Sequence, residues 1–417
     1  MKKLNLLAIL LLLLVSCNND DTFVPQCETA YSLGESNITH SSATLHWQDD
    51  NPSASYTIEY GPTGFVLGSG STANATEKSI TITGLQANTT YDFYVKSICD
   101  ANNVSILSDV RNFSTQPPLV VAEFRPNLSE LNLFQGALKN LQPSVYTFEY
   151  KLNTALYTDY AHKQRIIALP PGESMTYNGD GLPNFPDNTL IAKTFYYNID
   201  DRNELLGKTI IETRVLLKVN GEWLTGNYKW NASQTEAVLD NTGSTLPVTW
   251  VDNSGSTNNV NYKIPSDQDC FTCHQTYLNV TPIGPKLRSM NYSINGINQL
   301  RALKDRNYLT GVSDPSTVSV LPNWEDASQP TEARVRAYFD MNCAHCHSSG
   351  GFHNENYYEA LKLNFETSFN DSNIYDKRWS IMARIQTSID GYSMPFIGVT
   401  TPHTQALDLI IPYLESL

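Results

Sequence analysis

Two copies of the pattern Cys-x-x-Cys-His constrain this chain more than any other feature of its sequence. The first copy spans residues 270–274 and the second spans residues 343–347. The separation between the two cysteine pairs greatly exceeds the roughly 15–20 residues usual in a four-cysteine zinc site. Neither pair lies in the βαβ pattern that is typical of a redox dithiol, and both carry the trailing histidine. A zinc site and a redox dithiol are therefore the weaker alternatives for these motifs.

Thiols at this spacing lie one helical turn apart, so each can add to a vinyl group of one haem and form a thioether. The histidine that follows then points its imidazole at the iron as the proximal ligand. The pattern predicts two covalently attached haem c groups. The residues predicted to hold them are Cys270, Cys273, His274, Cys343, Cys346 and His347.

Residues 1–16 are typical of an export signal. Two lysines precede an apolar run from Leu6 to Val15 that is too short to span a bilayer stably. The run ends in Leu14-Val15-Ser16-Cys17, which resembles a bacterial lipobox. The resemblance implies cleavage before Cys17, lipidation of its thiol and a polar tether over residues 17–24. The alternative is an ordinary signal peptide followed by an incidental cysteine.

Two acyl chains give a lasting membrane anchor. We therefore expect an exported protein anchored to the outer membrane, facing the periplasm or the cell surface. The net charge of −14 makes nucleic acid and anionic membrane surfaces poor partners. Of the seven cysteines, Cys27 and Cys99 are left after the anchor and the two motifs are assigned. Because an exported chain reaches an oxidising compartment, we predict that these two form a disulfide.

Residues 25–117 contain short runs of alternating apolar and polar residues separated by turn signals. Trp47 lies in the second run, and Gly84-Leu85-Gln86-Ala87-Asn88-Thr89-Thr90-Tyr91 follows a later one. This stretch resembles a fibronectin type III domain. The resemblance implies that Leu85 enters the core and that Tyr91 is the corner tyrosine of the sandwich. It indicates the fold and says almost nothing about function.

Residues 119–265 are predicted to form a β-rich middle domain. Apolar residues alternate from Ile211 to Val219, and Asn220-Gly221 then predicts a tight hairpin turn. Residues 190–197 form a second predicted strand. The aromatic residues after the turn are expected to be core residues, with a sugar or partner site as the alternative.

From about residue 266 the alternation stops and helical periodicity begins. Residues 266–329 form the first haem segment. Residues 330–417 read as a helix, the second motif, a helix over 375–389, Met394-Pro395, and a final helix with Thr401 as cap and Pro402 at its first position. This order resembles a class I cytochrome c. The resemblance implies His347 as proximal and Met394 as distal ligand of the second haem.

The first haem has a less complete set of predicted ligands. Met290 is the nearest downstream candidate for its sixth ligand. An open or water-filled position is also possible at a haem iron. The other candidates are Met341, Met175, His162 and His353.

Several short segments together resemble a family of uncharacterised bacterial dihaem c-type cytochromes. The resemblance runs from about residue 120 to the end and rests on residues 157–161, 169–172, 211–214, 228–231, 282–286 and 342–347. The fibronectin-like module is an addition to this family, so we expect a multidomain chain with an all-β fibronectin type III sandwich, a β-rich middle domain and a mainly α cytochrome c-like C-terminal region. The leading hypothesis for its function is electron transfer between unidentified redox partner proteins. A dihaem peroxidase-type enzyme and a surface module that binds glycans or proteins are the alternatives.

Overall fold

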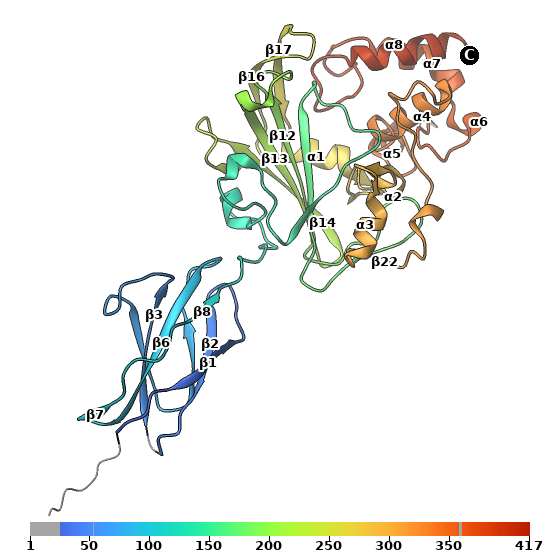
Figure 1. The fold of residues 1–417 in the computed structure, drawn as a ribbon. Coiled ribbons are helices and arrows are strands. Elements are labelled where there is room, and N and C mark those ends of the chain that lie inside the picture. The colour runs from blue at the N-terminus through green and yellow to red at the C-terminus, as the bar shows by residue number, and fades with distance from the viewer. Residues whose placement is uncertain (1–25, 53, 358–360) are drawn as a thin grey trace, which may run out of the picture. The chain divides into compact units, whose positions relative to one another are not determined.

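The computed structural model describes residues 26–417 except Ser53 and residues 358–360 (Figure 1). The chain forms two compact units, which divide between Pro118 and Leu119. The expected signal peptide, the tether and Cys17 lie outside the described residues. Within the described part of the chain, no helix is long and apolar enough to cross a membrane.

The first unit is a sandwich of two antiparallel sheets. One sheet has the order β1-β2-β5, formed by Tyr31–Ser36, Ser42–Gln48 and Ser79–Thr83. The other has the order β4-β3-β6-β7 with β8 also paired to β6, formed by Ser71–Ala75, Ser55–Pro62, Thr90–Asp100, Asn103–Val104 and Arg111–Ser114. Strand β2 alternates between buried and less buried residues, so one face of the strand enters the core.

The core of this unit is built around Trp47, whose ring centroid lies 5.0 Å from that of Tyr56. Leu85 is buried in the same core. The Tyr91 hydroxyl accepts a hydrogen bond of 2.9 Å from the Gln86 backbone N–H, so Tyr91 holds the corner between β5 and β6. The roles predicted for Leu85 and Tyr91 are those seen in the structure.

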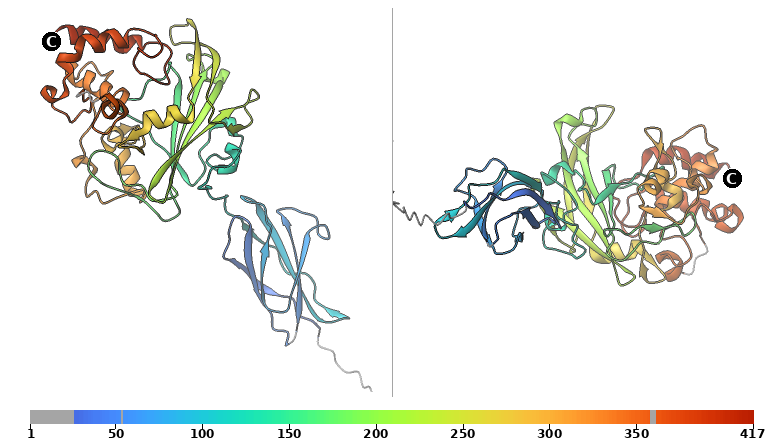
Figure 2. Two further views of the ribbon diagram at one scale, coloured as in Figure 1. Left: turned by 180° about the vertical axis from the view of Figure 1, so that it is seen from behind. Right: turned by 60° about the horizontal axis from the view of Figure 1, so that its bottom comes forward.

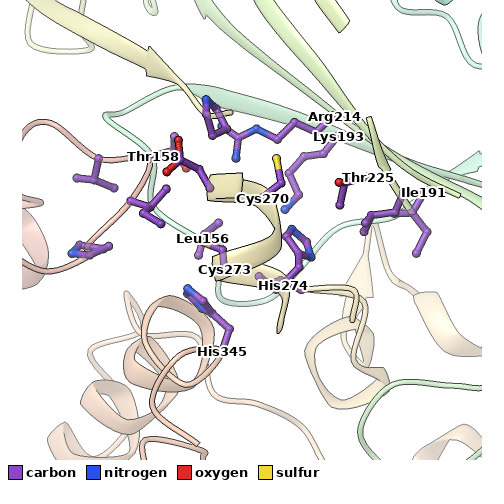
Figure 3. Close-up of a pocket in the computed structure, with 18 of the residues that line it drawn as sticks. Leu156, Thr158, Ile191, Lys193, Arg214, Thr225, Cys270, Cys273, His274 and His345 are labelled. Carbon is purple, nitrogen blue, oxygen red and sulfur yellow. The ribbon is translucent and has the colours of Figure 1, made fainter. Parts of the chain in front are cut away.

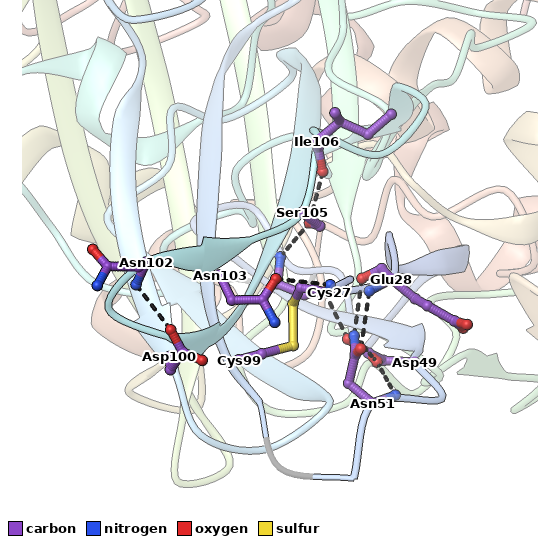
Figure 4. Close-up of a disulfide and its surroundings, with 11 residues drawn as sticks. Cys27, Glu28, Asp49, Asn51, Cys99, Asp100, Asn102, Asn103, Ser105 and Ile106 are labelled. Atoms are coloured by element: carbon purple, nitrogen blue, oxygen red, sulfur yellow. Dashed lines mark hydrogen bonds between the residues drawn. A yellow bond between two sulfur atoms is a disulfide. The ribbon is translucent and has the colours of Figure 1, made fainter. Parts of the chain in front are cut away.

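A disulfide joins Cys27, ahead of β1, to Cys99 near the end of β6 (Figure 4). The two Cα atoms are 5.8 Å apart and the residues are 72 positions apart in the chain. The Cys27 backbone N–H donates a hydrogen bond of 2.9 Å to the side-chain oxygen of Asn103. This is the pairing that the sequence predicts, and it fixes the start of the sandwich to its longest strand.

Replacing both cysteines, as Cys27→Ser with Cys99→Ser, should destabilise the first unit by about 4 kcal/mol, because the disulfide limits the freedom of a long loop in the unfolded chain. Calorimetry of the full chain should show the transition of the first unit at a lower temperature. The transition of the second unit is the internal control and should not move. A reductant should lower the first transition of the unsubstituted chain in the same way; an unchanged transition would contradict the role given to the disulfide.

The second unit is organised around a six-stranded antiparallel sheet with the order β15-β14-β13-β12-β10-β9. Its strands are Ala237–Leu239, Glu222–Trp230, Lys208–Val219, Leu190–Asn198, His162–Ala168 and Thr147–Glu149. Asn220 and Gly221 both have positive φ, at 52° and 84°, between β13 and β14. That geometry is required by a two-residue hairpin turn of the primed type, as the Asn-Gly pair predicts.

The two faces of this sheet pack against different parts of the chain (Figures 1 and 2). On one face, Ala168, Ala192 and Val215 pack with the short 3-10 helices η1 and η2, Leu128–Leu131 and Leu138–Asn140. On the other face, Ile167 and Ile191 pack with α2 and α3, Leu287–Met290 and Gln299–Asp305. The hairpin of β16 and β17, Ser244–Val251 and Thr257–Ile264, supplies Trp250 and Tyr262 to a further core with Phe195.

The remaining elements of the second unit are short strands and helices, and most of the helices lie in the C-terminal part of the chain. The short strands form three pairs. These are β11 (Met175–Thr176) with β22 (Leu309–Thr310), β18 (Gln275–Thr276) with β19 (Asn279–Val280), and β20 (Ser293–Ile294) with β21 (Ile297–Asn298). Two further 3-10 helices are η3 and η4, Glu204–Leu206 and Pro315–Thr317. The helices not yet named are α1 (Asp267–His274), α4 (Thr331–Asn342), α5 (Phe352–Tyr357), α6 (Phe369–Ser372), α7 (Ile374–Ile385) and α8 (Thr404–Glu415).

The strand-rich and helical segments that the sequence separates at residues 265 and 329 belong to one compact unit. Lys286, which precedes α2, donates hydrogen bonds of 3.0 Å to both carboxylate oxygens of Asp340 in α4. The Asp340 side chain is completely buried. One of its oxygens also accepts a bond of 3.1 Å from the Phe365 backbone N–H. A buried ion pair thus ties the first motif's segment to the helix that leads into the second motif.

The final helix begins later than the sequence predicts. We expected Thr401 as its cap and Pro402 as its first residue, whereas α8 starts at Thr404 with His403 in the capping position. The reason is a tertiary contact. The backbone N–H groups of Thr400 and Thr401 donate to the carboxylate of Asp159, which holds this stretch outside the helix.

Candidate functional site

The first Cys-x-x-Cys-His motif lies on the short helix α1. Its N-terminus is fixed by a capping box in which Ser266 accepts a hydrogen bond from the Asp269 N–H and Asp269 accepts one from the Ser266 N–H. The local sequence thus nucleates a helix that places Cys270, Cys273 and His274 within two turns. The helix packs against β14 and the motif faces a cavity.

His274 has the hydrogen bonding of an oriented ligand. Its Nδ1 lies 2.8 Å from the backbone oxygen of Thr281. Since a carbonyl only accepts, the proton is assigned to Nδ1 and the lone pair of Nε2 is left free. Burial, followed in size by the effect of the Lys193 charge, lowers the pKa of His274 to about 3. The imidazole is therefore neutral at physiological pH, which is the form that binds a metal.

The cavity beside this helix is small in this structure, with a volume of about 80 Å³. Its lining includes Cys270, Cys273 and His274 from the motif and Lys193 and Arg214 from the central sheet. Figure 3 shows the side chains of Lys193 and Arg214 reaching from the sheet towards the motif.

The second motif follows directly on α4, with Cys343 as the residue that ends the helix. The backbone N–H groups of Cys346 and His347 donate to the Cys343 oxygen at 3.1 and 3.0 Å, so the motif continues as a tight turn. A second cavity, of about 340 Å³, is lined by Cys343, Cys346, His347, His353 and Met394. Each motif therefore faces a cavity of its own.

His347 is buried, and that burial lowers its pKa to about 3. Its ring centroid is 4.3 Å from that of His353. Within the described residues, the Nδ1 atoms of both rings are buried without a hydrogen-bond partner. The neutral imidazole of His347, the ring of His353 and the Met394 side chain are thus gathered at one cavity.

The two cavities share part of their walls. Cys273, Asn342 and His345 line both, as do two residues of the loop that follows Met394. The side chain of Cys346, followed in size by burial, raises the pKa of the Cys273 thiol well above its usual value, so the two side chains lie close together. The Tyr277 backbone N–H also donates a bond of 2.8 Å to the oxygen of Gly350. Segments about 73 positions apart in the sequence therefore meet at the two motifs.

The thiols do not have the electrostatics of a redox dithiol. Burial raises the pKa of Cys270 to about 11 and that of Cys343 to about 12, whereas reactive cysteines have a lowered pKa. Among the described residues, no group of three or more His, Cys, Asp or Glu side chains is placed to hold a metal ion. A haem iron takes one or two protein ligands, so it does not require such a group.

Met394, which the class I cytochrome c resemblance implies as a distal ligand, lies on the wall of the second cavity. Its backbone N–H donates a bond of 3.0 Å to the oxygen of Arg384 in α7. The loop that follows it is fastened by Asp159. This fully buried carboxylate accepts hydrogen bonds from the Thr400 N–H, the Thr401 N–H and the Thr400 hydroxyl at 2.8–3.0 Å.

The sixth-ligand candidates of the first haem lie elsewhere. Met290 is completely buried in the core between the sheet and α2, and Met175 lies in the same core. Met341 packs with Leu321 and Ala337. His162 bonds to Asp201 at 2.7 Å. None of these side chains lines the first cavity, and His353 lines the second.

Sequence reasoning missed four residues at these sites, namely Lys193, Arg214, His345 and Asp159. His345 lies inside the second motif, where its spacing carries no signal. The other three come from strands and a loop far away in the sequence, and only the strand register brings them to the motifs. The aromatic residues of β14 are explained by packing, since Tyr228 and Trp230 are buried in the core.

Comparison with known proteins bears on the first unit. Residues 31–109 match the family model of the fibronectin type III domain. They form a fibronectin type III domain. Solved structures similar to this part include a computationally redesigned β-sandwich protein, at 23% identity, covering 22% of this chain and 98% of that chain with a TM-score of 0.20.

Another similar structure is the FN5 domain of Drosophila Lar, at 17% identity, covering 23% of this chain and 100% of that chain with a TM-score of 0.20. The chicken CNTN1 FN1-FN3 domains are similar at 16% identity, covering 22% of this chain and 31% of that chain, again with a TM-score of 0.20. No curated protein matches the chain significantly.

The substitution Asp159→Asn should destabilise the second unit by about 2–3 kcal/mol, because the amide cannot replace a carboxylate that accepts several hydrogen bonds. Calorimetry of the full chain measures the effect. The matched control Thr400→Val removes a single hydroxyl donor and should cost about 1 kcal/mol. An Asp159→Asn variant as stable as the unsubstituted chain would show that the loop is held by other contacts.

Proposed function

We propose that this chain is a dihaem c-type cytochrome that transfers electrons between partner proteins. In this proposal each Cys-x-x-Cys-His motif attaches one haem within the cavity that it faces. When bound, the two haem irons would each alternate between ferric and ferrous states, taking one electron from a donor protein and giving it to an acceptor. The donor and the acceptor are redox proteins whose identity stays open.

The observation that carries the proposal is the meeting of the two motifs. Cys273 belongs to the first motif and lines both cavities, and its thiol contacts Cys346 of the second. Groups attached at these cysteines would lie beside one another. That arrangement suits an electron relay, whereas two unrelated binding sites have no need of a common wall.

The residues present fit a haem at both places. At the first motif, two thiols stand one turn apart on α1, and His274 presents a free Nε2 to the cavity because Thr281 holds its Nδ1. At the second, Cys343, Cys346 and His347 follow in one tight turn opposite the loop of Met394.

Each chain residue has a defined task in this proposal. The cysteines fix the ring covalently, and His274 and His347 supply the proximal nitrogens. Met394 supplies a thioether to the second iron, which favours the reduced state relative to a second imidazole. Asp159 and Arg384 hold the loop that positions Met394, and the apolar walls keep water away.

The full chain with Cys17→Ser, produced in a strain competent for c-type maturation, should carry two covalent haems. Intact mass and a pyridine haemochrome spectrum measure the number. The variants Cys270→Ser/Cys273→Ser and Cys343→Ser/Cys346→Ser should each carry one. The control Cys27→Ser/Cys99→Ser should still carry two. A haem-free mass, in cells that mature a control cytochrome, would refute the proposal.

Met394→Ala should open the second iron, so that the reduced protein binds one more carbon monoxide per chain than the unsubstituted protein. Absorption spectra with and without carbon monoxide measure this. Met290→Leu is the matched control, because Met290 lies in the core, and it should change neither spectrum. Equal carbon monoxide binding by Met394→Ala and the unsubstituted protein would remove Met394 from the ligand set.

A dihaem peroxidase-type enzyme is the second candidate function. The observation in its favour is that none of the methionines lines the first cavity among the described residues, which suits an iron with an open position. Carbon monoxide binding by the unsubstituted reduced protein, together with peroxide-dependent turnover, would favour this function. Indifference of both haems to carbon monoxide would favour the relay.

The anchoring of the chain to the outer membrane through lipid on Cys17 is part of the proposal and rests on the lipobox resemblance alone. The fibronectin type III domain would then lie between the anchor and the haem-bearing unit in the chain.

A further inference from the structure

We propose that Lys193 and Arg214 bind the carboxylates of the porphyrin attached at the first motif, as the two cavity-lining members of a row of three cations on the central sheet that Arg165 completes. The inference rests on the proposed function and adds the residues that recognise the acidic edge of the ring. We call these three residues the cation row.

The row follows from the strand register. Arg165 in β10 is paired directly with Lys193 in β12, and Lys193 is paired directly with Arg214 in β13. Directly opposite residues of antiparallel strands project from the same face of a sheet, and like charges in these positions destabilise the pairing. Three neighbouring strands therefore carry one unfavourable line of positive charge. The sheet retains it in place of the apolar residues found on either side.

The charges lie where they are costly. The row interrupts an apolar face, with Ile167 and Ile191 on one side and Phe195 on the other. Arg165 is 7% exposed. Within the described residues, the Nε atoms of Arg165 and Arg214 are buried without a hydrogen-bond partner. Buried cations of this kind require a partner of opposite charge.

Acidic side chains of the protein neutralise only part of this positive charge. Glu212 is fully buried, and one of its oxygens lies 2.5 Å from Arg214 while also accepting a bond of 2.6 Å from the Tyr262 hydroxyl. Asp269, on the same cavity wall, is taken up by the capping box of α1. An excess of positive charge is left facing the cavity. A ligand with more than one carboxylate would neutralise it.

The position of the row selects the ligand. Lys193 and Arg214 line the first cavity together with Cys270 and His274, and Figure 3 shows their side chains directed at this motif. Only a group that reaches from these cysteines to the sheet contacts both. A haem joined to Cys270 and Cys273 through its vinyl groups carries its two carboxylates on the side of the ring away from the vinyl-bearing one. A free phosphate or a small organic acid would not need the thiols.

The test uses the full, haem-loaded chain with Lys193→Met or Arg214→Met. The control is Lys218→Met, which removes the same charge from β13 but lies outside the cavity. Resonance Raman spectra report the carboxylate side chains of the porphyrin, and a redox titration reports each iron. We expect Lys193→Met and Arg214→Met to shift the carboxylate bands of one haem. At a fixed solution potential, the ratio of reduced to oxidised iron at that haem should fall by roughly tenfold, because a partly buried cation favours the added electron.

The charge-retaining variant Lys193→Arg should keep the redox behaviour of the unsubstituted chain. Carboxylate bands and titrations that are identical in Lys193→Met, Arg214→Met and Lys218→Met would overturn the assignment. The haem content of each variant is measured first. Two haems per chain with unchanged bands reject only the cation row, whereas a chain without haem rejects the proposed function itself.

Discussion

The ion pair between Lys286 and Asp340 joins the two halves of the second unit, and the geometry of both Cys-x-x-Cys-His motifs depends on it. Lys286 follows the first motif by a short stretch, and Asp340 lies in the last turn of the helix that leads into the second. The carboxylate is fully buried and also holds the Phe365 backbone. Loss of either partner would leave an unpaired charge in the interior, which is far more costly than the pair itself. The contact therefore fixes where the segments meet, and the shared cavity wall follows from that position.

Local signals in the sequence predicted local structure well. The Asn220-Gly221 pair specified its hairpin because few residues tolerate positive φ at both positions. The corner held by Tyr91 and the buried Leu85 could likewise be predicted from a short motif in the chain. The two Cys-x-x-Cys-His motifs could be located from their spacing alone, and in the structure each motif faces a cavity. In all these cases the residues that determine the structure lie within a few positions of one another.

Features that depend on distant contacts could not be predicted. The start of α8 is displaced because a carboxylate from Asp159, more than two hundred positions earlier, binds Thr400 and Thr401. Met290 is close to the first motif in sequence but is directed into the core by the packing of α2 on the sheet. The cation row is a property of three strands in register and has no counterpart in any single segment.

The register of β10, β12 and β13 also restricts which length changes this chain can accept. Successive residues of a strand face opposite sides of a sheet, so one added residue ahead of Lys193 would turn its side chain to the other face. Ile191 and Phe195 would turn with it and leave their cores. Insertions and deletions are therefore tolerated in the loops that connect these strands. Within the strands the number of residues is fixed, because the cavity-lining side chains and the core side chains must each stay on their own face of the sheet. Related chains with the same site should differ in length at the loops and agree in length from residue 163 to 168 and from residue 191 to 195.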